Sequence, residues 1–302
     1  MERKPNCDTI TIQETKMYQS DLFAQSNDLG ANRNYDHLIN LDGTSVKGCT
    51  IIYGPAGQAG EYSALATNPY SGCGHKCAYC YVPNVLRITR EQFDLGATLR
   101  NNFLSLLAKD AAKYKLAKLD GQVMLSFTTD PYHPFDNTAT KEVIQILQNH
   151  GLGVCTLTKG GSRALRDIKL FRPNKDAFAS TLTSLDDTFS QKWERGAALP
   201  MDRINTLKKF YEAGIFTWVS LEPTLDTESS KAILKATHKF VNLFKIGRAN
   251  YLPITHNTDW QSYTHAMVDI CNKLQIKHYI KKDLQPYLPK DYYNPLRIIQ
   301  HN

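Results

Sequence analysis

Three cysteines fall within eight residues of the run Asn68-Pro69-Tyr70-Ser71-Gly72-Cys73-Gly74-His75-Lys76-Cys77-Ala78-Tyr79-Cys80-Tyr81. Their spacing is C-x3-C-x2-C, and thiolates this close together in a glycine-containing loop can converge on one face of a metal cluster. A cluster of four irons and four sulfides ordinarily takes four cysteines, one for each iron. Three cysteines would leave one iron with an open position for a substrate or a cofactor.

A zinc ion held by the same three cysteines and His75 is the alternative interpretation of this run. Structural zinc sites usually take paired ligands from two separate loops, and the sequence has no second C-x2-C pair. His75 also lies between the first two cysteines, an awkward position for a fourth ligand. The run therefore favours an iron–sulfur cluster on Cys73, Cys77 and Cys80.

The composition of the 302 residues is typical of a soluble globular protein, with 42% hydrophobic and 22% charged residues. The formal net charge of +7 favours an anionic partner, such as a nucleic acid, without requiring one. The apolar runs are too short to span a bilayer, and residues 1–6 lack the apolar core of a secretory signal. We therefore expect a cytoplasmic protein without a membrane partner.

The remaining cysteines are Cys7, Cys49, Cys155 and Cys271, and they show no mutual spacing. An odd total of seven cysteines in a long chain without an export signal does not indicate a disulfide framework. We expect these four to be dispensable for cluster assembly.

Strand-like and helix-like segments alternate from about residue 95 onward. We expect strands at 123–127, 153–158, 177–182, 215–221, 240–246 and 276–280, and helices at 97–116, 139–149, 162–170, 201–212, 227–238 and 259–273. This alternation predicts βαβ units around one parallel sheet, and the number of units fits a barrel or partial barrel. Residues 1–60 show no periodic pattern and are expected to be an N-terminal extension. The barrel and its C-terminal βα elements would then occupy residues 61–302.

The carboxyl ends of the strands carry the chemistry in such barrels. That rule selects the polar groups where the expected strands stop, namely residues 127–130, 158–159, 180–183, 220–222 and 246–248. Lys159 stands directly before two glycines, where a cation and free backbone N–H groups suit an anion such as a carboxylate. Glu222 follows an expected strand, so we expect it to point into the pocket.

The cysteine run followed by several βα units resembles the radical S-adenosylmethionine superfamily. The resemblance implies a partial (βα)6 barrel and a 4Fe-4S cluster whose open iron binds the amino and carboxylate groups of S-adenosylmethionine. An electron from the cluster then cleaves the sulfonium C–S bond, and the resulting 5′-deoxyadenosyl radical abstracts a hydrogen atom. An external electron donor similar to flavodoxin or ferredoxin is also implied.

A narrower resemblance, to spore photoproduct lyase and the DNA repair photolyase-related proteins, covers about residues 68–250. It rests on the cysteine run, on Thr128-Thr129-Asp130-Pro131-Tyr132 and on Thr158-Lys159. The resemblance implies that Lys159 contacts the carboxylate of S-adenosylmethionine, that Ser180 contacts the same cofactor and that Tyr79 packs near it. Tyr81 is the candidate for relaying a hydrogen atom. Thr128, Asp130 and Glu222 are further candidates for cofactor binding, and Asp130 is equally well explained as a turn residue.

One position departs from the lyase pattern. The lyases carry a hydrogen-donating cysteine directly before the segment that matches Thr128, whereas this chain has Ser126 and Phe127 there. Neither side chain donates a hydrogen atom as a thiol does. We therefore do not expect efficient repair of spore photoproduct by the known route. The family likeness and the basic charge balance favour a radical enzyme that acts on a nucleic acid or nucleotide. The alternatives are a radical enzyme for a peptide or small metabolite, and a zinc- or cluster-stabilised nucleic-acid-binding module without catalysis.

Overall fold

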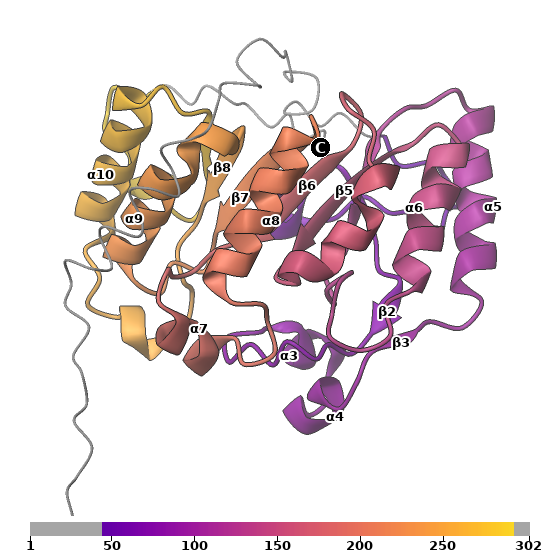
Figure 1. Cartoon of the computed structure of the whole chain (residues 1–302), viewed down its shortest axis with the longest axis horizontal. Helices are drawn as coiled ribbons and strands as arrows, with labels where there is room; N and C mark the ends of the chain where they lie inside the picture. Colours follow the sequence, from indigo (N-terminus) through magenta and orange to yellow (C-terminus); the bar gives the residue numbers. More distant parts are fainter. Residues whose placement is uncertain (1–43, 293–302) are drawn as a thin grey trace, which may run out of the picture.

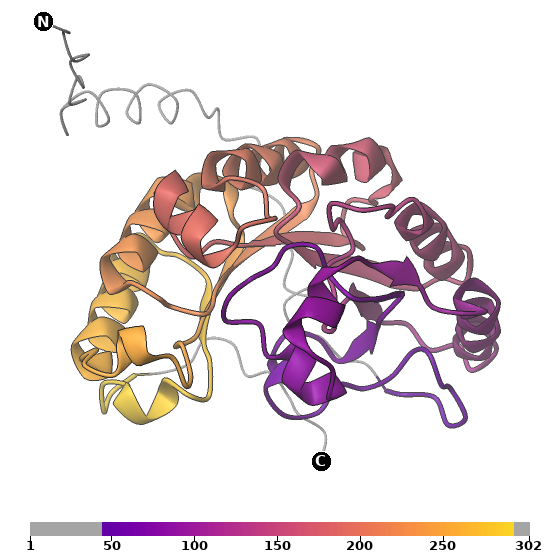
Figure 2. The ribbon, with the colours of Figure 1, turned by 90° about the horizontal axis from the view of Figure 1, so that it is seen from below.

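The structure of the chain is a computed structural model that describes residues 44–292. Within these residues, seven parallel strands form one sheet in the order β1-β4-β5-β6-β7-β8-β9. Helices line one face of the sheet (Figure 1), and the sheet bends into an arc with those helices on its outer side (Figure 2). The segment that follows β1, including α3 and α4, lies on the inner side of the arc (Figure 2). The predicted partial (βα)6 barrel is confirmed.

The strands of the curved sheet are short and buried. They are β1 (Leu65–Thr67), β4 (Gln122–Leu125), β5 (Gly153–Thr158), β6 (Ala177–Thr181), β7 (Phe216–Leu221), β8 (Leu243–Ile246) and β9 (His278–Ile280). Two further strands, β2 (Tyr70–Ser71) and β3 (Thr98–Leu99), pair antiparallel with each other. The parallel register sets Thr67 beside Leu125 and Thr158 beside Ser180, so the carboxyl ends meet at one edge of the sheet.

The longer helices cover the outer face. The helices are α3 (Val82–Leu86), α4 (Arg90–Asp94), α5 (Phe103–Leu116), α6 (Ala139–Asn149), α7 (Asp187–Trp193), α8 (Pro200–Glu212), α9 (Thr227–Thr237) and α10 (Trp260–Lys273), with 3-10 turns η1 (Gly57–Glu61), η2 (Gly161–Leu170), η3 (His238–Phe240), η4 (Pro253–Thr255) and η5 (Gln285–Tyr287). Asp186, Asp226 and Asp259 each accept a hydrogen bond from a backbone N–H of the helix that follows, which fixes where α7, α9 and α10 begin. Within the described residues, no helix combines the length and apolar content that a membrane span requires.

Most predicted elements are found at or near their expected places, and the differences have local causes. The helix expected at 97–116 begins at Phe103, because Thr98 and Leu99 pair with β2. The segment expected as a helix at 162–170 is the 3-10 turn η2. The three-residue β1 was not predicted, since three residues show no periodicity.

Two apolar layers hold the sheet. The outer layer lies between the strands and the helices, where the Phe178 and Phe210 rings stack with centroids 3.7 Å apart. The inner layer is smaller and includes Met124, Cys155 and Trp218. Successive residues of a strand face opposite sides, so apolar side chains pack on both faces, although polar side chains such as Thr217 and Lys245 are also buried within the strands.

The expected N-terminal extension lies mostly outside the described residues, as do residues 293–302 at the other end of the expected barrel domain. Its last part is tied to α5, because Asp110 accepts hydrogen bonds from the backbone N–H groups of Thr50 and Ile51 at 2.7 and 2.6 Å. The η1 turn then crosses the predicted boundary at residue 60. That boundary stays a prediction.

Candidate functional site

The carboxyl ends of the strands open into one cavity of about 530 Å³. Most of the residues selected from the sequence line it: Cys73, Cys77, Tyr79, Cys80, Tyr81, Thr128, Asp130, Lys159 and Glu222. These residues come from the loop after β1 and from the ends of β4, β5 and β7. The structure therefore gathers, at one edge of the sheet, groups that are separated by up to 149 residues in the sequence.

The backbone of the cysteine loop is held from α4. Arg90 donates two hydrogen bonds, to the carbonyl oxygens of Cys77 at 3.0 Å and Cys80 at 2.9 Å. The backbone N–H of Cys73 donates to the Phe93 carbonyl at 3.0 Å. The planar guanidinium group fixes two carbonyls at once. Arg90 was not identified from the sequence, because nothing in the spacing connects it with the cysteines.

The end of α7 and the segment that follows it hold the loop from another side. The N–H of Ala78 donates to the Trp193 carbonyl at 2.8 Å, and the N–H of Gly196 donates to the His75 carbonyl at 2.9 Å. A Cβ atom at position 196 would lie 2.0 Å from the carbonyl oxygen of Gly74. The approach of the two backbones therefore requires glycine at position 196.

Glu194, which lies between Trp193 and Gly196 in the chain, belongs to a buried ion pair. Arg203 and Glu194 meet at 2.6 Å with side chains that are 1% and 0% exposed, and the Tyr79 hydroxyl also donates to Glu194. Burial by itself would raise the pKa of Glu194, but Arg203 and Lys159 hold it below its ordinary value. Glu194 thus stays an anion beside the predicted cofactor residues Tyr79 and Lys159. The sequence analysis missed Glu194, which follows no strand and belongs to no motif.

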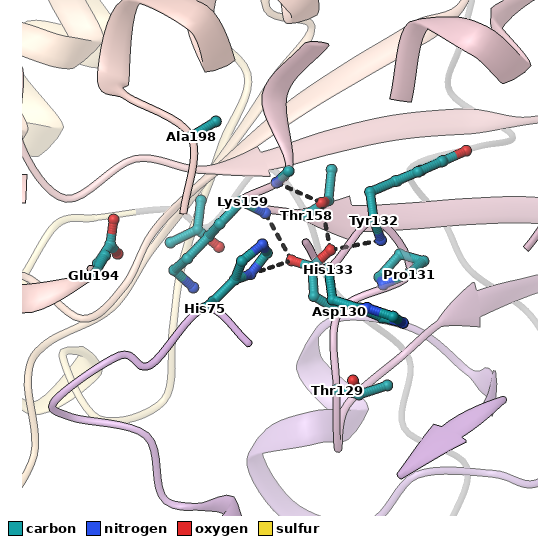
Figure 3. Close-up of polar contacts among 12 residues, drawn as sticks. His75, Thr129, Asp130, Pro131, Tyr132, His133, Thr158, Lys159, Glu194 and Ala198 are labelled. Carbon is teal, nitrogen blue, oxygen red and sulfur yellow. Dashed lines mark hydrogen bonds and ion pairs between the residues drawn. The ribbon is translucent and has the colours of Figure 1, made fainter. Parts of the chain in front are cut away.

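Asp130 ties the loop to the strand ends (Figure 3). Its carboxylate accepts hydrogen bonds from the Thr158 hydroxyl at 2.5 Å and from the N–H groups of Lys159 and Tyr132, both at 2.8 Å, and it pairs with His75 Nδ1 at 3.2 Å. Burial would raise the pKa of Asp130, but His75 and these donors hold it well below its usual range. The observed contacts give Asp130 a positioning role. A direct contact with a cofactor stays a prediction.

His75 faces this network with both ring nitrogens. Nδ1 pairs with Asp130, and Nε2 lies 2.9 Å from a guanidinium nitrogen of Arg163. Within residues 44–292 no three His, Cys, Asp or Glu side chains are grouped as a ready-made site for a single metal ion. The contacts with Asp130 and Arg163 occupy both ring nitrogens of His75 and therefore do not favour it as a fourth zinc ligand.

Lys159 enters the cavity beside the thiols. Its ammonium group lies 5.6 Å from the centroid of the Tyr79 ring. Burial would lower the pKa of Lys159, but the neighbouring Cys77 and Glu194 side chains raise it above its ordinary value. Lys159 is therefore a cation available to a carboxylate.

Ser180, by contrast, is buried and donates to the Thr158 carbonyl at 2.9 Å, and it is not among the residues that line the cavity. Its contact with the cofactor stays a prediction.

The end of β4 contributes Phe127 and Thr128. Asn68 accepts hydrogen bonds from both of their N–H groups, at 2.8 and 3.0 Å. The Thr128 hydroxyl is buried and has no hydrogen-bond partner within the described residues, so it is available to a bound molecule. Tyr81 is 55% exposed at the same cavity, and its hydroxyl donates to the Phe127 carbonyl at 3.3 Å.

The thiols fit an iron–sulfur cluster by their chemistry. Burial raises the pKa of all three, and that of Cys77 reaches about 12. Thiolates buried in this way need a cation to be stable, and iron is a metal that thiolates bind. Cys49, Cys155 and Cys271 do not line the cavity. Cys7 lies outside the described residues.

Residues 67–240 match the family model of the radical SAM superfamily. This match covers more than half of the chain, and the chain belongs to that superfamily. One curated relative, the uncharacterized protein ORF301 of Acidianus two-tailed virus, is 23% identical over 197 residues, which are 61% of this chain and 64% of that protein. The chain thus spans less than two thirds of the relative's length.

Solved structures share the fold at low sequence identity. A mutant of spore photoproduct lyase superposes with a TM-score of 0.60 at 12% identity, over 78% of this chain and 79% of that one. Streptococcus suis SuiB bound to S-adenosylmethionine superposes with a TM-score of 0.56 at 12% identity, over 76% of this chain and 52% of that one. The likeness to spore photoproduct lyase that the sequence suggested is therefore found in the fold.

Proposed function

We propose that Cys73, Cys77 and Cys80 hold a 4Fe-4S cluster with which this enzyme acts on S-adenosylmethionine and on a nucleic acid or nucleotide substrate. The observation that carries the proposal is that the three thiols and the Lys159 ammonium line one cavity at the carboxyl edge of the sheet. When bound, the cluster supplies an electron to S-adenosylmethionine, whose 5′-deoxyadenosyl fragment then takes a hydrogen atom from the substrate.

The residues of the chain would bind and orient the cofactor. Lys159 places a cation where the carboxylate of S-adenosylmethionine can pair with it, and the Thr128 hydroxyl supplies a further hydrogen bond. Arg90 and Glu194 keep the loop and Tyr79 in position. Val82, Phe93 and Leu157 add apolar surface to the cavity wall, which helps to exclude water.

A nucleic acid or nucleotide substrate is supported by charge and by aromatic side chains. The chain has a formal net charge of +7. Tyr81 and Tyr251 line the cavity and are 55% and 99% exposed, so their rings can stack on bases. Phe127 lines the cavity at the place where the lyases carry a thiol, and Tyr81 is the proposed hydrogen relay. We further propose a cytoplasmic location and an electron donor similar to flavodoxin or ferredoxin.

Anaerobic reconstitution with iron and sulfide tests the proposal. A brown protein that absorbs near roughly 400 nm, as iron–sulfur charge transfer does, and that forms 5′-deoxyadenosine from S-adenosylmethionine after reduction would support it. A colourless protein that retains zinc would instead support a binding module without catalysis. Formation of 5′-deoxyadenosine that is stimulated by peptides and not by nucleic acids would overturn the substrate class alone.

A further inference from the structure

The wall of the cavity formed by β7 and β9 carries a pair of opposite charges. Glu222 follows β7 and Lys281 follows β9, and both line the cavity. Glu222 Oε2 accepts hydrogen bonds from the Lys281 ammonium and from the Tyr62 hydroxyl. The Lys281 and Glu222 side chains are 1% and 16% exposed. Asp130 and Lys159, by contrast, follow β4 and β5.

The pair is held in one arrangement by its neighbours. The Lys281 ammonium lies 4.3 Å from the Tyr62 ring centroid, and the Tyr62 hydroxyl lies 3.0 Å from Ser220 Oγ. A Cβ atom at Gly247 would come within 2.9 Å of both the Glu222 and the Lys281 side chains. Glycine at position 247 thus lets the pair close over the end of β8. A site fixed before binding loses little freedom when its ligand arrives.

Both polar groups keep hydrogen-bonding capacity for a ligand. The contacts of Glu222 go to Oε2, and within residues 44–292 Oε1 has no hydrogen-bond partner. The Lys281 ammonium has three N–H donors: one goes to Glu222, and the ammonium also forms an ion pair with Glu61 Oε2 at 3.9 Å, which leaves a donor for a ligand. A ligand that meets both side chains must therefore present an acceptor for Lys281 beside a donor for Glu222.

This requirement favours a ligand that carries both groups on one edge. A single trans peptide unit places its N–H and C=O on opposite sides, so a peptide could meet both side chains only through the N–H and C=O of one extended residue. The Watson–Crick edge of a nucleobase carries an acceptor directly beside a donor on one planar ring. That edge is occupied in a duplex, so only an unpaired or extruded base could present it inside a cavity.

We propose that Glu222 and Lys281, positioned by Tyr62, bind the Watson–Crick edge of an unpaired nucleobase. This assignment rests on the proposed function for its setting and names the part of the substrate that enters the cavity. It gives Glu222 a role in substrate binding in place of the cofactor contact expected from the sequence. The substrate is then a nucleotide, a single strand or a base extruded from a duplex.

Calorimetry with nucleosides tests the assignment on the full chain without added cofactor. The probes are uridine with N3-methyluridine and guanosine with N1-methylguanosine, since each methyl group blocks the Watson–Crick donor. We expect at least one pair in which the methylated nucleoside binds about ten- to a hundredfold more weakly, the usual loss for a hydrogen bond to a charged group. Equal affinity within both pairs, or tighter binding of glycylglycine amide, would overturn the assignment.

Variants of the two residues test whether the loss of affinity on methylation arises at Glu222 and Lys281. In Glu222→Gln and Lys281→Met, a nucleoside and its methylated form should bind with similar affinity. The matched surface changes Glu212→Gln and Lys273→Met should keep the difference in affinity between them. Affinity for S-adenosylmethionine should stay within about twofold in Glu222→Gln, and a large loss would return Glu222 to the cofactor. Discrimination between nucleosides in a protein that forms no 5′-deoxyadenosine would retain the subsite and reject the radical chemistry. Formation of 5′-deoxyadenosine by a protein that does not discriminate between the nucleosides of a pair would reject the subsite alone.

Discussion

The two groups of polar residues in the cavity are built in different ways. Around the cysteines, the protein holds mainly backbone: Arg90 binds two carbonyls, and Gly196 donates to a third. At the β7–β9 wall, by contrast, the side chains of Glu222, Lys281 and Tyr62 contact one another directly. The loop fixed by its backbone presents free thiols to a bound group, whereas Glu222 and Lys281 fix each other and also line the cavity. This difference supports the proposal that the first wall binds the cofactor and the second the substrate.

The largest expected effect is at the cysteine loop. Replacing Cys73, Cys77 or Cys80 with alanine should remove most of the iron, because each thiol is assigned to a different iron of the cluster. Iron and sulfide per chain after anaerobic reconstitution give the measurement. The matched controls are alanine variants of the four scattered cysteines. Loss of most iron in one of those controls would indicate a fourth ligand or a second cluster.

The reaction of the lyases is the next comparison. We expect the reduced protein to form 5′-deoxyadenosine yet to release little thymine from a dinucleotide spore photoproduct. Phe127 lines the cavity, and an aromatic C–H bond is a far poorer hydrogen donor than a thiol. Both products can be followed in one chromatographic assay. Stoichiometric or catalytic repair would show that another residue, such as Tyr81, serves as donor.

Breaking the buried pair behind the loop should destabilise the whole fold. Arg203→Met leaves Glu194 charged and buried without its partner, a change that costs about 3–5 kcal/mol. Chemical denaturation of the unreconstituted protein measures the free energy of unfolding. The control is Lys231→Met, which removes the surface pair with Glu228 and should cost less than about 1 kcal/mol. Equal losses in the two variants would show that the Arg203–Glu194 pair contributes no more than a surface contact.

The smallest expected effect is at Lys159. A charge-assisted contact with a carboxylate contributes about 1.5–3 kcal/mol, so Lys159→Ala should weaken binding of S-adenosylmethionine roughly ten- to a hundredfold. Equilibrium binding to the reconstituted protein measures it, and Lys192→Ala on the surface of α7 is the control. Unchanged affinity in a folded variant with full iron content would remove Lys159 from the cofactor site.

The regular part of the fold could be predicted from the sequence because its signals are local. The helix at 139–149 and the strand at 153–158 are found at their predicted bounds. The short strand β1 and the helix α7 were missed. β1 is buried at all three positions and so shows no alternation, and α7 has only seven residues, although Asp186 provides a capping signal before it.

The candidate site was predictable only where a motif or a strand end marked it. The three cysteines, Lys159 and Glu222 meet that condition, and all line the cavity. Arg90 and Glu194 help to hold these residues in place, but they belong to no motif and do not stand at the end of a strand. They could not be predicted, because their contacts are made between segments distant in the chain. Lys281 illustrates the same limit: its pairing with Glu222 depends on a barrel that brings β7 and β9 together, across 59 residues of sequence.

Deuterium transfer tests the central claim, which is that the cavity joins a cofactor to a nucleic acid or nucleotide substrate. The reconstituted, reduced enzyme is given S-adenosylmethionine with uniformly deuterated nucleotides or single-stranded DNA, and the 5′-deoxyadenosine is analysed by mass spectrometry. The account predicts deuterium in 5′-deoxyadenosine from one of these donors and none in the protein with Cys77→Ala. The claim would be contradicted if 5′-deoxyadenosine forms and carries deuterium from a deuterated peptide but never from a deuterated nucleotide or DNA strand.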